Sequence, residues 1–332
     1  MRRSKKLIPM DRDSARPQAL RKRLPHMPNI VIVGDRESGK TTFLAFLYTA
    51  QVRSGSDRAD DFRFHVAYES IDEISGVFQQ VMSGNFPDSA AKEGIRSISF
   101  HLGYRRSGWG IWSRLRSPGW TPGAPASLQF ILLRNLEDEM DRFRKGSSLG
   151  NAMLRDVLGS EAIAILVDGR KLARAGEDRQ LGPMGKYDGA VEALLTALQR
   201  SRGRGSGTSL HPLFVFTKFD AVDPGALRAA AVESEPPEVR KAGLRTAYGE
   251  ALLDHNLPNT MARVRAPEPH GMRFTTPSYF FSWVRTEAAA PGRRERIRLR
   301  RGEGGGWEPD YSKDEYLALL ECLWRIARDA GG

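Results

Sequence analysis

The segment from Gly34 to Thr41 has the residue types and spacing that bind a polyphosphate. It reads G-D-R-E-S-G-K-T and matches the pattern G-x-x-x-x-G-K-[ST] at every fixed position. In that pattern, backbone N–H groups and the positive end of the following helix surround the phosphates. The lysine reaches the β- and γ-phosphates, and the threonine hydroxyl takes one Mg²⁺ position. A glycine-rich turn without a ligand is the alternative. The predicted phosphate-binding residues are Gly34, Asp35, Arg36, Glu37, Ser38, Gly39, Lys40, Thr41 and Thr42.

A second candidate site is the sequence Thr217-Lys218-Phe219-Asp220, which directly follows an apolar strand. The Asp220 carboxylate could accept hydrogen bonds from the N1–H and 2-amino groups of guanine, and adenine lacks both donors. The Lys218 stem could cover one side of the base. These residues resemble the [NT]-K-x-D guanine motif of the TRAFAC-class, Ras-like GTPases, although a solvated turn at a strand end is the alternative. Ser282 lies where the last guanine-contacting turn of that family would fall.

The resemblance to TRAFAC-class GTPases covers residues 28–285 and preserves the order of the elements. Over residues 37–41 the phosphate loop is similar to that of heterotrimeric G-protein α subunits. The whole pattern looks nearer to the bacterial double-GTPase group, which is encoded with multi-component conflict systems. This resemblance implies that GTP or GDP and Mg²⁺ are the ligands. It also implies a switch-type protein that acts as a regulatory component of a bacterial multi-protein system. Hydrolysis would be an in-line attack by water, with stabilisation by Lys40.

The third strand of the family ends in D-x-x-G, and this chain departs from that pattern. The strand over residues 128–133 continues into R-N-L-E-D-E, so Asn135 stands on the metal-binding aspartate and Asp138 on the glycine. Glu139 then takes the position that orients the attacking water, and Ser89 is the nearest candidate for the metal-binding switch residue. Asn135 supplies no charge, and a carboxylate at Asp138 would repel the γ-phosphate. We therefore expect slow or partner-dependent hydrolysis. A nucleotide-holding pseudo-GTPase is the first alternative.

Asp168 ends a continuous apolar strand and could serve as a metal acid. In that case the protein would be a phosphate-loop ATPase or kinase, and the sequence at 217–220 would be incidental. The other interpretation is that Asp168 caps the loop that follows its strand.

Apolar strands that alternate with amphipathic helices predict an α/β fold. We expect a P-loop NTPase sheet of the Ras-like GTPase type, mostly parallel, with helices on both faces. The expected strands are 30–33, 62–66, 98–102, 128–133, 162–167, 213–216 and 279–284. The expected helices are 39–52, 71–82, 188–200, 237–255 and 313–330. Residues 1–27 form a basic arm, and residues 28–332 form one domain with insertions at about 104–126 and 285–311.

The composition fits a folded chain whose positive charge is concentrated in a few segments. The 332 residues are 40% hydrophobic and carry a net charge of +11, and Cys322 is the single cysteine. The absence of any long apolar run, together with the lone cysteine, predicts a cytoplasmic protein without a transmembrane segment. Arginine and lysine gather in the arm, which could contact a polyanion weakly, and in both insertions. Protein partners could bind at the switch loops, 84–96 and 134–150, or at the first insertion, whose tryptophans are Trp109, Trp112 and Trp120. That insertion could instead bind nucleic acid by stacking and phosphate pairing, or pack against its own sheet.

Overall fold

The computed structural model describes the greater part of the chain. The described residues are 28–52, 60–66, 71–87, 97–106, 126–133, 136, 156–177, 182–201, 209–266, 272–287, 295–302 and 305–331. The predicted basic arm and most of the first insertion lie outside these residues.

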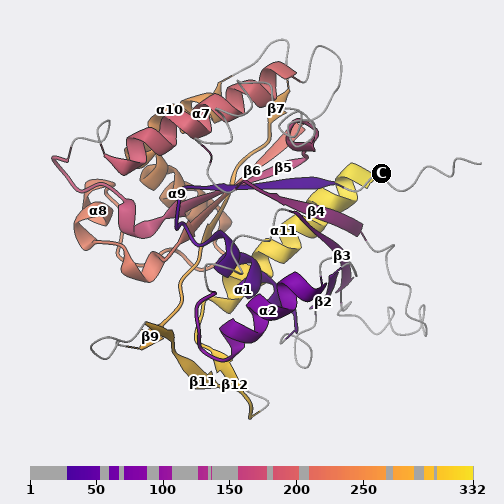
Figure 1. Ribbon diagram of the computed structural model, residues 1–332. Helices are drawn as coiled ribbons and strands as arrows, with labels where there is room; N and C mark the ends of the chain where they lie inside the picture. The colour runs from indigo at the N-terminus through magenta and orange to yellow at the C-terminus, as the bar shows by residue number, and fades with distance from the viewer. Residues whose placement is uncertain are drawn as a thin grey trace, which may run out of the picture.

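An eight-stranded sheet forms the centre of the molecule (Figure 1). Its strands are β1 (Asn29–Gly34), β2 (Asp60–Val66), β3 (Ser97–Arg106), β4 (Ala126–Leu132), β5 (Ala162–Asp168), β6 (Ser209–Thr217), β7 (Arg273–Phe274) and β8 (Ser278–Phe281). Their order is β2-β3-β4-β1-β5-β6-β7, and β8 also pairs with β6. The pairs β1–β4, β1–β5, β5–β6, β6–β7 and β6–β8 are parallel, whereas β2–β3 and β3–β4 are antiparallel. The predicted α/β fold with a mostly parallel sheet is confirmed.

Helices cover both faces of the sheet, because apolar side chains point to both sides of each central strand. Along β1, Ile30 and Ile32 belong to one buried cluster, and Val31 and Val33 belong to the other. The first cluster packs against α1 (Lys40–Val52), α2 (Ile71–Met82) and α11 (Lys313–Gly331). The second cluster packs against α7 (Pro183–Ser201), α9 (Ala242–Asn256) and α10 (Pro258–Arg265). Figure 1 shows the sheet between these two groups of helices.

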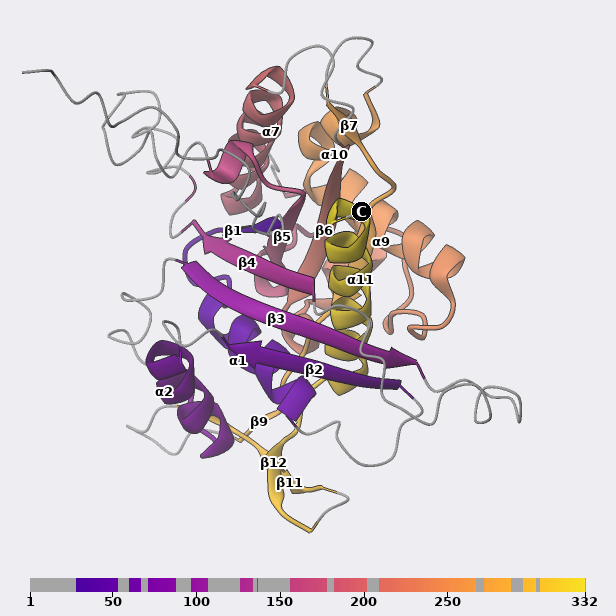
Figure 2. The same cartoon turned by 90° about the vertical axis from the view of Figure 1, so that its right-hand side faces the viewer.

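The second insertion forms two short antiparallel ribbons that extend from one end of the molecule (Figure 2). They consist of β9 (Thr286–Glu287), β10 (Arg296–Ile297), β11 (Leu299–Arg301) and β12 (Trp307–Pro309). The backbone N–H of Ile297 donates to the carbonyl of Gly84 at 2.9 Å, just after α2. The side chain of Ile297 is 1% exposed and joins the first buried cluster. The insertion is therefore attached to the domain at the end of α2.

Several element boundaries differ from the prediction for identifiable reasons. The helix expected from Pro237 begins at Ala242, after a turn in which the N–H of Lys241 donates to the carbonyl of Glu238 at 2.9 Å. The helix α7 begins earlier than expected, at Pro183, a residue type that suits the first helical position. The strand expected over 279–284 runs from Ser278 to Phe281, because the carbonyl of Ser282 and the N–H of Trp283 bond to Phe219 and Ser312 instead of continuing the ladder.

Candidate functional site

The candidate functional residues lie at the carboxyl ends of neighbouring parallel strands. The predicted phosphate loop follows β1, Asp168 ends β5, Thr217 ends β6, and Ser282 follows β8. In the sheet order β4-β1-β5-β6, the connection from β1 leads to β2 on one side of β1, whereas the connection from β4 leads to β5 on the other side. Ligands of open α/β sheets bind at such a point, beyond the carboxyl ends of the strands. The fold thus brings together residues that are far apart in the sequence.

The phosphate loop is a tight turn with two residues in the left-handed region. Glu37 has φ of 64° and Gly39 has φ of 84°, and the N–H of Ser38 donates to the carbonyl of Asp35 at 3.1 Å. A Cβ atom on Gly34 would lie 2.3 Å from Ser38 Oγ. A Cβ atom on Gly39 would meet no atom within 4 Å. Gly34 is therefore required by close packing inside the loop, whereas Gly39 is required by its backbone conformation and faces open space.

The start of α1 fits an anionic ligand. The first N–H groups of a helix have no partner within the helix itself. In the described part of the chain, the N–H groups of Lys40, Thr41 and Thr42 have no other backbone acceptor. These donors lie beside the open space at Gly39 and at the positive end of the helix dipole, so a phosphate group would satisfy them.

The Lys40 side chain spans the phosphate loop. Its Nζ atom donates to the carbonyl of Gly34 at 2.6 Å and to that of Asp35 at 2.9 Å. Burial lowers the pKa of the Lys40 ammonium to about 8; Asp35 opposes this shift, and the nearby Lys171 and Lys218 add to it. An anion bound at the loop would supply the negative charge that this buried cation lacks.

The candidate guanine motif is attached directly to the phosphate loop. Thr217 Oγ1 donates to the carbonyl of Ser38 at 2.8 Å, across 179 residues of sequence. Lys218 Nζ donates to the carbonyl of Glu37 at 2.5 Å. Lys218 itself has φ of 52°, which turns the chain sharply at the end of β6. The two motifs found in the sequence therefore form one continuous site.

Asp168 lies beneath this contact, with its side chain 1% exposed. Its Oδ2 atom accepts a hydrogen bond from Lys218 Nζ at 2.6 Å, and its Oδ1 atom accepts one from the N–H of Arg170 at 3.1 Å. Burial acts to raise the pKa of Asp168, but the hydrogen bonds from Lys218 and Arg170 outweigh it and lower the pKa. Both carboxylate oxygens are thus engaged by protein donors, and the carboxylate orients Lys218 toward the loop.

Asp220 faces the turn that follows β8. Its Oδ1 atom lies 3.4 Å from the N–H of Val284, and burial raises the pKa of the Asp220 carboxyl. Ser282 is buried: its hydroxyl lies 2.7 Å from the Tyr316 hydroxyl, and its N–H donates to the carbonyl of Phe216 at 2.7 Å. The side chain of Ser282 therefore holds the turn in place, and Asp220 remains the candidate for reading the base.

Sequence reasoning did not single out Lys171, which the structure places at the phosphate loop. Lys171 Nζ forms an ion pair with the Asp35 carboxylate and donates to the carbonyl of Arg36 at 3.3 Å. Its position shortly after the end of β5 was the available signal, because neighbouring strand ends share one edge of the sheet.

Three predicted site residues, Ser89, Asn135 and Glu139, lie outside the described residues, as do Trp109, Trp112 and Trp120. Among the residues that the structure describes, no group of three or more His, Cys, Asp and Glu side chains could hold a metal ion. Within the same residues, no helix is both long and apolar enough to cross a membrane.

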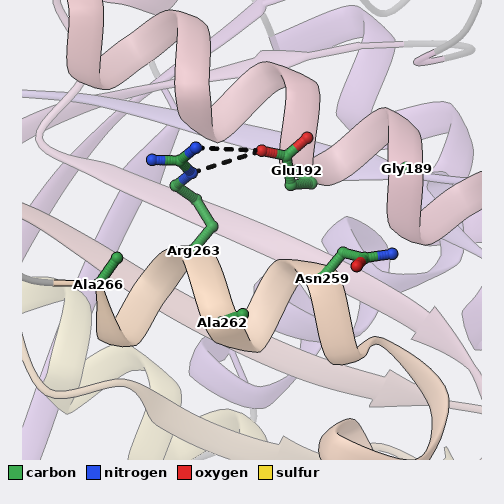
Figure 3. Close-up of a pocket in the computed structure, with 6 residues that line it drawn as sticks. All are labelled: Gly189, Glu192, Asn259, Ala262, Arg263 and Ala266. Carbon is green, nitrogen blue, oxygen red and sulfur yellow. Dashed lines mark hydrogen bonds and ion pairs between the residues drawn. The ribbon is translucent and has the colours of Figure 1, made fainter.

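A separate cavity lies between α7 and α10 (Figure 3). Its volume is about 370 Å³, and Arg263 pairs with Glu192 at 3.4 Å within it. The residues that line it are Gly189, Glu192, Asn259, Ala262, Arg263 and Ala266. None of them belongs to the phosphate loop or to the guanine motif.

No protein-family model matches the chain, and no curated protein matches it significantly. Similar solved structures include the septin GTPase domain from Chlamydomonas reinhardtii, with 13% identity, a TM-score of 0.34, and coverage of 92% of this chain and 94% of that chain. The SRb-GTP/SRX complex from Chaetomium thermophilum matches with 10% identity and a TM-score of 0.32, over 77% of this chain and 91% of that chain. The GTP-bound Ski7 GTPase-like domain of S. cerevisiae matches with 12% identity and a TM-score of 0.32, over 77% of this chain but 43% of that chain. These values are too low to carry a functional argument, which rests on the contacts of the site.

Proposed function

We propose that this protein is a GTP-binding, switch-type protein. The observation that carries the proposal is the pair of hydrogen bonds from Thr217 and Lys218 to the carbonyls of Ser38 and Glu37. These bonds hold the end of β6 against the loop, so one nucleotide could contact both the loop and the Asp220 carboxylate. The phosphates would lie on residues 34–42, and Asp220 would accept from the N1–H and 2-amino groups of guanine.

Different groups of the loop would contact the phosphates and the metal ion. Lys40 and the N–H groups at the start of α1 would hold the β- and γ-phosphates, and Thr41 is placed in the first turn to contribute one ligand to Mg²⁺. When bound, Mg²⁺ supplies positive charge that neutralises the phosphates. Asp168 serves as the residue that orients Lys218, because both of its oxygens already accept from protein donors. This arrangement favours the GTP-binding proposal over an ATPase or kinase that uses Asp168 as its metal acid.

Hydrolysis of GTP is proposed to be slow or to depend on a partner. Asn135 and Asp138 stand where the family has a charged metal ligand and a glycine, and Glu139 would orient the attacking water. Both departures act on the transition state more than on binding, because the phosphate loop supplies most of the ground-state contacts. We expect turnover well below the ~1 s⁻¹ of good phosphoryl-transfer enzymes. Phosphate release should rise when Asn135→Asp and Asp138→Gly are combined; brisk wild-type turnover would contradict this assignment.

The biological role that we propose is that of a regulatory component in a bacterial multi-protein system. The switch loops, 84–96 and 134–150, and the Trp/Arg-rich insertion would provide contacts to protein partners. The basic arm would add a weak, salt-dependent attraction to a polyanion.

Competition binding tests the proposed function. A fluorescent GTP analogue would be displaced with unlabelled GTP, GDP and ATP, first from the wild-type protein and then from Lys40→Ala. We expect GTP and GDP to compete far better than ATP, and we expect Lys40→Ala to weaken binding by about 10- to 100-fold. Lys171→Ala is the matched control, since it removes a lysine at the same loop whose side chain is 26% exposed and bonded to protein atoms. Equal competition by ATP would refute the guanine assignment, and unchanged affinity in Lys40→Ala would refute the phosphate-loop assignment.

A further inference from the structure

The first turn of α11 contacts three consecutive residues, Phe281, Ser282 and Trp283, at the end of β8. The N–H of Phe281 donates to a carboxylate oxygen of Glu315 at 3.0 Å. The Ser282 hydroxyl lies 2.7 Å from the Tyr316 hydroxyl in the buried interior. The N–H of Trp283 donates to Ser312 Oγ at 3.0 Å, and the N–H of Ser312 returns a bond to the Trp283 carbonyl at 3.1 Å. We call residues 281–284 the base turn, because they lie beside Asp220.

The residue types at the start of α11 would ordinarily cap the helix. Ser312-Lys313-Asp314-Glu315 has the spacing of a capping box, in which the glutamate side chain bonds back to the N–H of the cap residue. In this structure Glu315 instead accepts from the N–H of Phe281 in the base turn. Its two carboxylate oxygens also accept from the guanidinium of Arg245, at 3.0 and 2.5 Å. Side chains that could stabilise the helix end are used to hold the base turn.

Arg245 makes this arrangement rigid. Its side chain is 7% exposed, and besides Glu315 it donates to the carbonyl of Tyr279 at 3.1 Å and to that of Pro237 at 2.6 Å. Its guanidinium also lies 4.9 Å from the centre of the Phe281 ring. Glu315 is therefore fixed between α9 and β8, and a fixed carboxylate positions the Phe281 N–H better than a mobile one.

The base turn is in turn bonded to the guanine motif. The N–H of Phe219 donates to the carbonyl of Ser282 at 2.9 Å, and the N–H of Val284 lies 3.4 Å from Asp220 Oδ1. A continuous series of hydrogen bonds thus runs from Glu315 and Tyr316 through the base turn to the carboxylate that would read the base.

We propose that Tyr316, together with Ser312 and Glu315, positions the base turn and so determines how strongly the site distinguishes guanine from adenine. The inference rests on the proposed GTP-binding function and concerns residues that do not touch the nucleotide. Tyr316 acts through Ser282, and Ser312 acts through Trp283. The C-terminal helix is thereby part of the specificity apparatus.

The test removes one hydroxyl at a time and measures base discrimination. Tyr316→Phe keeps the ring and leaves the Ser282 hydroxyl without its partner, so we expect the affinity ratio of GTP over ATP to fall about fivefold. Ser312→Ala, which removes the hydroxyl that accepts from the N–H of Trp283, should also lower the ratio. Tyr248→Phe is the matched control: it removes a tyrosine hydroxyl that donates to the carbonyl of Glu233 at 2.9 Å, and it keeps the ring that packs edge-on against Phe281. This control should leave the ratio unchanged whatever it does to the melting temperature.

A double-variant cycle separates positioning from general stability. If Tyr316 acts through Ser282, the double variant Ser282→Ala with Tyr316→Phe should have a GTP-over-ATP affinity ratio no lower than that of the single variant with the lower ratio. A wild-type protein that prefers GTP, with an unchanged ratio in both Tyr316→Phe and Ser312→Ala, would overturn the positioning role and leave the proposed function standing. A wild-type protein without preference for GTP would overturn both.

Discussion

Removing the ammonium of Lys218 should both destabilise the fold and weaken nucleotide binding. Lys218→Met keeps most of the stem but eliminates the bonds to the Glu37 carbonyl at 2.5 Å and to Asp168 Oδ2 at 2.6 Å. Asp168 would keep only Arg170, whose side chain is 50% exposed and 3.3 Å away. A lost charge-assisted bond costs about 1.5–3 kcal/mol, and breaking a buried pair costs about 3–5 kcal/mol. Because Arg170 remains, we expect a loss of about 2–3 kcal/mol.

The expected loss corresponds to a fall of about 3–4 °C in melting temperature for a chain of 332 residues. Lys171→Met provides the comparison, since its ion pair with Asp35 is formed by side chains that are 26% and 31% exposed. That variant should lose less than about 1 kcal/mol. The double variant Asp168→Asn with Lys218→Met removes the uncompensated charge, so stability should recover while nucleotide affinity stays low.

Thermal denaturation and titration of a fluorescent GTP analogue, on all four proteins, measure these two effects separately. The reasoning is refuted if Lys218→Met matches Lys171→Met in melting temperature. It is also refuted if the double variant recovers full nucleotide affinity, because the hydrogen bond from Lys218 to the Glu37 carbonyl would then not be needed for nucleotide binding.

Three further predictions follow from the site. Only protonated Lys40 attracts phosphate, and burial lowers the pKa of Lys40 to about 8. GTP affinity measured across pH should therefore be flat well below pH 8 and fall by up to about tenfold per pH unit above it. A flat profile to pH 10 would contradict this. Gly34→Ala would place a Cβ atom 2.3 Å from Ser38 Oγ and should destabilise the protein by about 1–3 kcal/mol in denaturant unfolding, a loss that Ser38→Ala should partly relieve if the clash is its cause. Asp220→Asn should weaken GTP binding and strengthen binding of xanthosine triphosphate, whose 2-oxo group can accept from the new amide; competition titration with both nucleotides decides this, and retained GTP preference would contradict the base-reading role.

The sequence predicted where the candidate site lies wherever that position depends on local pattern. The glycines and Lys40 of the phosphate loop follow a strand and begin a helix, and their spacing alone indicated the loop. The alternation that places Ile30 and Val31 in different buried clusters could likewise be inferred from a short apolar run between helices. Such features depend on neighbours in the chain, so sequence reasoning reaches them.

The parts that sequence reasoning missed depend on long-range contacts. Nothing near Ser312 or Tyr316 indicates a partner 29 to 34 residues earlier, because the sequence does not show that the chain comes back to β8 after the second insertion. The capping-box pattern at Ser312 even favours a different, local set of bonds. Asp168 presented two open roles in the sequence, and its contacts with Lys218 and Arg170 became visible only once β5 and β6 were paired.

Identifying the nucleotide bound to the purified protein tests the central claim most directly. The wild-type protein and Lys40→Ala would be purified in parallel and denatured, and the released nucleotide would be identified and quantified by chromatography. The proposal predicts GDP or GTP from the wild-type protein and much less from Lys40→Ala. An adenine nucleotide in the wild-type protein, or equal amounts of guanine nucleotide from both proteins, would contradict it.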